Sequence, residues 1–149
     1  MADSSIATKD VEDWIRGKTL PTIYHQKFTK RKLPLLYSGE FECDAVSNDG
    51  KIVCFISTSF RKTKSGKHGA GKFSKIRADA YWALSLKKKP NKILFIFTDK
   101  SMIELINQEK NNGRFPRHFK TLSINLPLSI KKKLTELKRK AAAEVSNRK

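Results

Sequence analysis

Acidic residues are scarce in this chain of 149 residues. Lysine and arginine together number 32, against 14 aspartates and glutamates, so the formal net charge is +18. An imbalance of this size favours a polyanionic partner, because each phosphate neutralised by lysine or arginine releases counterions. We therefore expect nucleic acid as the partner, with duplex DNA favoured, and keep an anionic membrane or ribosome surface as the alternative.

Long apolar runs, paired cysteines and clustered histidines are also missing. The longest apolar run, Ile93 to Phe97, is much shorter than the roughly 18 residues of a spanning helix. The first residues, MADSSIATKDVEDW, lack the basic and apolar regions of a secretory signal. Cys43 and Cys54 show no CxxC spacing, and the three histidines have no zinc-site spacing. These absences predict a cytoplasmic protein with reduced cysteines and no membrane-spanning segment.

Apolar residues are present in sufficient number for a core. They make up 38% of the chain and include nine phenylalanines and two tryptophans, which favours a folded protein over a disordered one. No repeat or linker divides the chain. We expect one domain over residues 9–145, between a flexible N-terminus at residues 1–8 and a basic tail at residues 146–149.

The hydrophobic periodicity predicts an α/β protein, a single domain with a mixed β-sheet of about five strands flanked by helices. Gly17 is expected to stop the first helix and Leu20-Pro21 to prevent its continuation, while residues 22–28 are open between helix and strand. Pro34 favours an edge strand. The expected elements are a helix over 9–16, an edge strand over 33–37, a hairpin over 40–47 and 51–60, a helix from 73 or 74 to 86, a buried parallel strand over 92–98, a helix opened by a Ser101–Glu104 capping box and ending near 110, a strand over 119–126 and a helix over 129–145.

The hairpin is the most informative stretch. Its first strand alternates Glu40, Glu42 and Asp44 with less polar residues, which is the period of a β-strand. If Asp49-Gly50 is a two-residue turn, the register places Asp44 opposite Phe55, with Glu42 opposite Ser57, on one face. Solvent exposure of an antiparallel strand is an equally simple explanation of these carboxylates.

The order helix–strand–strand–strand–helix–strand, together with this hairpin, resembles the restriction-endonuclease-like fold of the PD-(D/E)xK nuclease superfamily. Members of that family carry an aspartate on the second strand and then a third strand reading roughly hydrophobic-Glu-x-Lys. Glu42-Cys43-Asp44, the turn and Lys51 to Ser59 look like that hairpin, and the likeness covers about Val11 to Thr98. Phe55 stands where the family has its glutamate and Ser57 where it has its lysine.

The resemblance implies a Mg²⁺ site, which needs carboxylates on neighbouring strands and a cation near the attacking water. Asp44 is the expected catalytic aspartate and metal ligand, with Glu42 as a second ligand. Since Phe55 cannot ligate, other side chains would have to complete the site. Lys75 is the expected catalytic lysine, with Lys72, Asp79 and Glu12 of the neighbouring helices as further replacements.

The segment after the hairpin is a glycine-rich basic loop. The stretch from residue 60 to residue 92 holds eleven basic residues and a single acid, Asp79. Glycines let backbone N–H groups approach phosphate oxygens. The predicted phosphate contacts are Arg61, Lys62, Lys64, Lys67, Lys72 and Lys75. Gly66 to Lys72 also fits the GxxxxGK part of a nucleotide-binding P-loop, but Phe73 stands where that motif needs Ser or Thr.

Three hypotheses follow. The first is a nucleic-acid-binding domain with an altered catalytic motif, acting with a partner protein or as a homodimer. The second is an active endonuclease that uses Mg²⁺ and a displaced lysine and acid. The third is an RNA- or ribosome-associated protein in which the carboxylates have no catalytic role.

Overall fold

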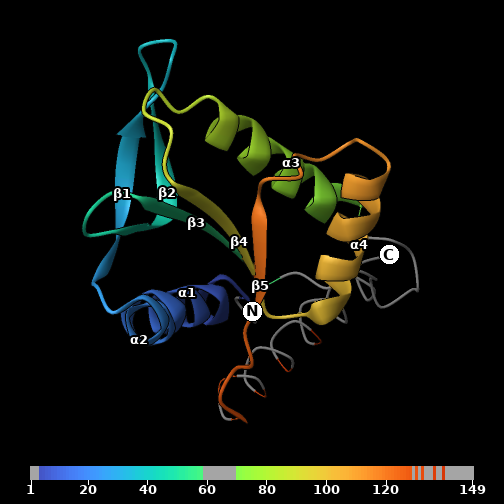
Figure 1. Ribbon diagram of the computed structural model, residues 1–149. Helices are drawn as coiled ribbons and strands as arrows, with labels where there is room; N and C mark the ends of the chain where they lie inside the picture. The colour runs from blue at the N-terminus through green and yellow to red at the C-terminus, as the bar shows by residue number, and fades with distance from the viewer. Residues whose placement is uncertain are drawn as a thin grey trace, which may run out of the picture.

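A five-stranded sheet, with its strands in chain order, forms the middle layer of the computed structural model (Figure 1). The structure describes residues 4–58 and 70–128, together with residues 130, 132, 136 and 139, and the side chains from residue 9 and, after the gap, from residue 73. The strands are β1 (Phe28–Pro34), β2 (Glu40–Ser47), β3 (Ile52–Ser57), β4 (Lys92–Phe97) and β5 (Lys120–Ser123).

The sheet is mixed. β1, β2 and β3 pair antiparallel, whereas β3, β4 and β5 pair parallel. β3 and β4 are buried along almost their whole length, because helices cover both faces, and this explains their continuous apolar sequences. The predicted fold class, a single α/β domain with a mixed sheet of five strands flanked by helices, is confirmed.

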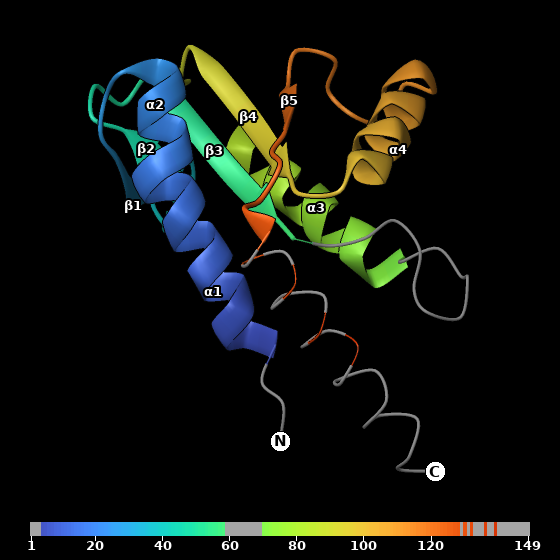
Figure 2. The same cartoon turned by 90° about the horizontal axis from the view of Figure 1, so that it is seen from below.

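Two hydrophobic clusters fill the space between the sheet and its helices. α1 (Ser4–Trp14) and α2 (Leu20–Tyr24) cover one face, and α3 (Ala70–Leu84) and α4 (Lys100–Asn111) cover the other (Figure 2). On the α3 side the Phe95 ring lies 5.2 Å from Phe55 and 5.5 Å from Phe119, centroid to centroid. Cys43 and Cys54 are free and buried, and burial raises the pKa of each thiol to about 12.

The N-terminal helix is longer than predicted. It begins at Ser4 and passes Gly17 through a π-helical turn, η1 (Ile15–Thr19), in which Leu20 N–H bonds to Ile15 C=O, before continuing as α2. Pro21 does not break it because a proline in the first turn of a helix segment has no intrahelical N–H bond to lose. The expected stops at Gly17 and at Leu20-Pro21 are therefore wrong.

Other boundaries shift by a few residues. β1 is an edge strand, as Pro34 predicts, but it spans Phe28–Pro34 rather than residues 33–37 and so contains Lys30, Arg31 and Lys32. α4 is capped by Asp99, whose carboxylate accepts from Ser101 N–H at 3.0 Å, so Asp99 and not Ser101 is the N-cap.

The C-terminal helix is described at a few positions, and residues 128, 130, 132, 136 and 139 are helical there. The rest of the helix predicted over 129–145, and the tail at 146–149, lie outside the described residues. Among the helices of the described part of the chain, none has the length and apolar character needed to cross a membrane.

Candidate functional site

β2 and β3 pair closely beside their turn and then separate. Ala45 lies opposite Cys54 and Val46 opposite Val53, which is the predicted register. The turn itself differs from the two-residue turn assumed at Asp49-Gly50: Gly50 N–H bonds to Ser47 C=O at 2.9 Å, and Gly50 has a positive φ of 75° whereas Asp49 has not. Farther from the turn, the β1–β2 ribbon runs away from β3 (Figure 1). The two strands therefore form a fork that opens at Asp44.

Asp44 occupies the fork because of a bulge in β2. Thr29 pairs with Val46 and Arg31 with Cys43, so Asp44 and Ala45 together stand against the single residue Lys30. An extra residue of this kind bends its strand and interrupts the alternation of faces. Cys43 accordingly packs on the α3 side and Ala45 on the α1 side.

The Asp44 carboxylate takes the place of a strand partner. Its Oδ2 accepts a hydrogen bond from Ile56 N–H at 2.8 Å, which satisfies a donor in a part of β3 that β2 has left. The predicted pairing of Asp44 with Phe55 is not seen. Phe55 instead belongs to the core on the α3 side, where its ring contacts Phe41 and Phe95.

The N-terminal helix is fastened over the same fork. Arg16 Nε, in the π-helical turn, donates to the main-chain oxygen of Asp44 at 2.7 Å. The same guanidinium reaches Asp13 at 2.9 Å and Glu12 at 3.8 Å. Glu12, one turn before Arg16, is thereby placed beside Asp44, and its side chain is only 18% exposed.

α3 contributes the remaining charged side chains. Lys75 and Asp79 lie one turn apart on this helix, Lys75 exposed and Asp79 half-buried. Asp79 feels the charges of Asp44, Lys75 and Glu12. Lys75 in turn acts on both Asp44 and Glu12. We call Glu12, Asp44 and Asp79 the acidic cluster, and Lys75 is its cation from α3.

All three carboxyl groups of the acidic cluster are harder to ionise than usual. Burial is the largest cause in each case. Repulsion from Asp44 adds to it at Glu12 and raises the pKa of that side chain. At Asp44 the Ile56 N–H bond and the charge of Lys75 oppose the effect without cancelling it, so the pKa is still raised.

Asp79 is affected most. Burial, followed by repulsion from Asp44 and Glu12, raises its pKa to about 6 although Lys75 partly offsets this. Like charges that share a site repel, and the group that ionises last shows the largest shift. Buried carboxyl groups with specific charged neighbours are characteristic of functional sites.

The donors of the acidic cluster suit a hard divalent cation such as Mg²⁺, which prefers carboxylate oxygens. As the side chains stand, no three Asp, Glu, His or Cys groups among the described residues are close enough together to hold a metal ion. The carboxylate donors are of the type that binds such a metal, but these three side chains would have to move closer together before they could coordinate one ion. A cation there would also relieve the repulsion that raises the pKa of Asp79.

Of the predicted site residues, the structure brings Asp44 and Lys75 together. Glu42 is half-exposed and its carboxylate pairs with Lys30 Nζ on β1 at 3.1 Å. Arg61, Lys62, Lys64 and Lys67 lie outside the described residues, as does the side chain of Lys72.

Arg16 and Lys30 were not predicted to belong to this site, yet their charges act on Asp44 and Glu12. The spacing of Glu12 and Arg16, four residues apart, was a usable signal for a shared helix face. Nothing in the sequence indicated that this face meets β2.

Comparison of the chain with protein-family models, with curated proteins and with solved structures found no match.

Proposed function

We propose that this protein binds nucleic acid, duplex DNA in the first place, and that it is a restriction-endonuclease-like protein whose catalytic residues have been relocated. The support for binding is the charge of +18 on 149 residues. Such a surface attracts phosphate backbones strongly and with a steep dependence on salt. The family assignment is supported by the order of the elements and by an aspartate on the second strand of the sheet's hairpin.

The observation that favours an active enzyme is the meeting of the acidic cluster with Lys75. These four side chains come from α1, β2 and α3, and they influence one another's charge. Solvated surface carboxylates would not need to share a partly buried site, because burial of a charge is unfavourable without a compensating role. We therefore favour the active endonuclease over the domain that only binds.

In this proposal Asp44, Asp79 and Glu12 would hold the metal, and Lys75 would provide the cation that Ser57 cannot. A bound Mg²⁺ would lower the pKa of a water molecule and stabilise charge on the phosphate. The lysine ammonium adds positive charge where the phosphorane develops negative charge. Arg16 positions the site by holding the β2 backbone at Asp44.

The proposal is tested with supercoiled plasmid, Mg²⁺ or Mn²⁺, and the variants Asp44→Asn and Lys75→Ala. The expected result is nicking by the wild type and a loss of at least about 100-fold in each variant, the size of a lost charge-stabilising group. Glu40→Gln, an exposed carboxylate of the same strand, is the matched control and should retain activity. Nicking that persists in Asp44→Asn, or its absence from the wild type at every salt and metal concentration, would reject the enzymatic role.

Binding is tested separately, by titrating labelled duplex DNA and structured RNA over a range of salt concentrations. We expect the logarithm of affinity to fall linearly with the logarithm of salt, by about 0.9 for each phosphate contacted. A slope near zero would exclude the phosphate backbone as the ligand. Preference for structured RNA over duplex DNA would favour the RNA- or ribosome-associated alternative.

A further inference from the structure

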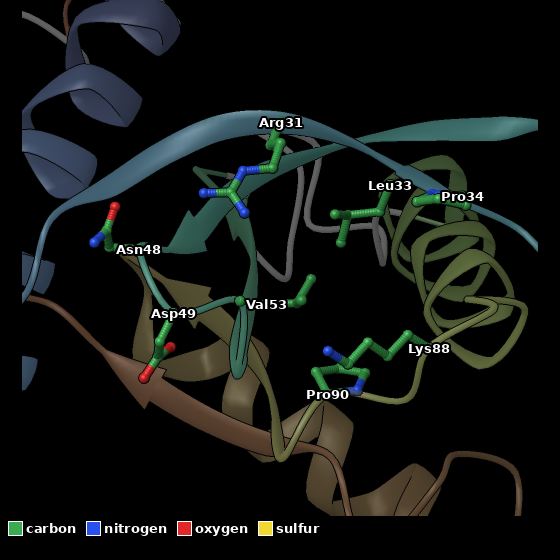
Figure 3. A pocket seen from close by; sticks show the side chains of 9 residues that line it. Arg31, Leu33, Pro34, Asn48, Asp49, Val53, Lys88 and Pro90 are labelled. Atoms are coloured by element: carbon green, nitrogen blue, oxygen red, sulfur yellow. The ribbon is translucent and has the colours of Figure 1, made fainter.

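A second feature of the molecule is a pocket of about 330 Å³ beside the β2–β3 turn (Figure 3). Its apolar walls come from Leu33, Pro34, Val53 and Pro90. Val53 belongs to the cluster between the sheet and α3, and Leu33 packs against that cluster. The pocket therefore opens on the α3 side of the sheet, whereas Ile56 and Ala45, next to the fork, face α1.

Two cations reach into this pocket from different elements. Arg31 lies on the edge strand β1, and Lys88 lies in the segment after α3 (Figure 3). Arg31 is half-buried. Within the described part of the chain, neither side chain forms an ion pair with an aspartate or glutamate. A half-buried arginine without an anionic partner has gained no counter-charge for the water contacts that its side chain has lost.

Asp49, the acidic residue that lines the pocket, does not supply this missing negative charge. Its Oδ1 accepts from Ser47 Oγ at 2.7 Å and from Lys51 N–H at 3.0 Å, and its Oδ2 accepts from Gln26 at 3.4 Å. Figure 3 shows its carboxylate turned away from Arg31 and Lys88. The aspartate is thus committed to the turn, and no acid among the described residues pairs with Arg31 or Lys88 of the pocket.

We propose that this pocket binds the phosphate group of a nucleotide, with the attached sugar or base against its apolar wall. Arginine and lysine on opposing walls suit phosphate, since the guanidinium offers paired N–H donors and the ammonium a point charge. Leu33, Pro34 and Pro90, which are partly or fully exposed, offer a surface for a ring rather than for a second charge. The volume is in the lower part of the range for small-molecule sites, about 300–1,000 Å³.

The phosphate belongs either to a nucleic-acid strand or to a free nucleotide. We favour a strand because it is long enough to pass both sites. Consecutive residues of β1 point to opposite faces, so that Lys30 acts on the acidic cluster and Arg31, the next residue, lines the pocket. The choice of a strand rests on the proposed function, whereas the recognition of phosphate rests on the pocket alone.

The experiment compares two double variants of equal net charge. Arg31→Ala with Lys88→Ala removes the cations of the pocket. Lys32→Ala with Lys89→Ala removes their exposed sequence neighbours, which do not line it. The probes are adenosine monophosphate, followed by calorimetry, and a labelled oligonucleotide with or without a 5′-phosphate, followed by fluorescence polarisation. Thermal unfolding checks that both variants fold.

We expect the pocket variant to lose at least about 10-fold in affinity for a phosphate-bearing probe, the effect of one charge-assisted hydrogen bond, and the control to lose about two-fold or less. Loss on the monophosphate identifies a free nucleotide. Loss on the 5′-phosphorylated strand alone identifies a terminal phosphate, and equal loss on both strands identifies a backbone phosphate. If the pocket variant unfolds, Lys88→Gln against Lys89→Gln repeats the comparison.

Equal affinities of the pocket and control variants for every probe would overturn the proposal, as would a wild type that binds none of them. These results are distinct from failure of the proposed function. A wild type that binds oligonucleotides but shows no pocket effect would leave nucleic-acid binding intact. A wild type that binds the monophosphate but no strand would leave the pocket intact and remove the strand-binding role.

Discussion

Replacement of Asp79 by asparagine should stabilise this protein at neutral pH. Burial and the neighbouring Asp44 and Glu12 carboxylates raise the pKa of Asp79 from 3.8 to about 6. The folded state therefore holds the proton of Asp79 more tightly than the unfolded chain does. This contribution to stability is fully present below about pH 4 and is lost as the pH rises through about 6. Asparagine keeps the shape of the side chain and carries no charge to repel its neighbours.

The magnitude follows from the shift. About two pKa units at 1.36 kcal/mol each give about 3 kcal/mol of lost stability above pH 7. Because Asp79 is half-buried rather than enclosed, solvent screening reduces this to roughly 1–2 kcal/mol. The gain of Asp79→Asn over wild type should thus be about 1–2 kcal/mol at pH 7.5 and close to zero at pH 3.5.

The measurement is urea unfolding of wild type, Asp79→Asn and Glu40→Gln across this pH range. Glu40→Gln is the control for net charge, since it removes one negative charge from an exposed position of a strongly basic protein, where effects stay within about 0.5 kcal/mol. Adding Mg²⁺ at pH 7.5 should raise the stability of wild type more than that of Asp79→Asn, if the acidic cluster binds the ion.

A variant less stable than wild type at pH 7.5 would refute the reasoning, because it would mean that the Asp79 carboxylate is stabilised in its charged form. A gain of the same size at pH 3.5 and 7.5 would also refute it, since the effect would then have no connection with ionisation.

Two further substitutions test the packing on the α3 side, both by urea unfolding. Phe95→Ala should cost about 3–5 kcal/mol, because this ring is 2% exposed and contacts the rings of Phe55, Phe115 and Phe119; a cost below about 1 kcal/mol would contradict its central place in the core. Glu109→Gln should lower the free energy of unfolding by about 1–3 kcal/mol, because the buried Glu109 carboxylate forms ion pairs with Arg77 at 3.2 Å and with Arg114 at 3.0 Å. An unchanged midpoint would show that these pairs are as weak as fully solvated ones.

Local patterns were sufficient for most of the fold. The alternation over Glu40–Ser47 and the turn residues at Asp49-Gly50 predicted a hairpin and its register next to the turn, since strand period and turn composition are local properties. The turn type was not predicted, because the turn closes between Ser47 and Gly50. The apolar run that became β4 predicted a buried parallel strand for the same reason. The failures at Gly17 and Pro21 arose because a π-helical turn lets the chain pass both residues. Packing of Ile15 and Leu20 against the sheet outweighs the weak helix propensity of Gly17 and Pro21.

The candidate site was predicted in part. Asp44 and Lys75 were the expected catalytic pair, and Asp79 and Glu12 were among the possible replacements for the missing glutamate. Their grouping could not be predicted, because Glu12, Asp44 and Asp79 lie on three elements far apart in the chain. The bulge at Asp44 depends on how β1 pairs with β2, which is a non-local property that the alternation of side chains does not report.

The sequence by itself determined the strong positive charge, the α/β succession, the hairpin and the residues available for catalysis, since composition and short-range periodicity carry all of these. The tertiary structure decided which of them meet. It separated β2 from β3 at Asp44, bound the π-helical turn of the N-terminal helix there through Arg16, and placed Lys75 and Asp79 of α3 where their charges interact with the same carboxylate. The physical reason is that charges interact through space, and only the packed arrangement of helix and sheet sets the distances and the burial on which those interactions depend.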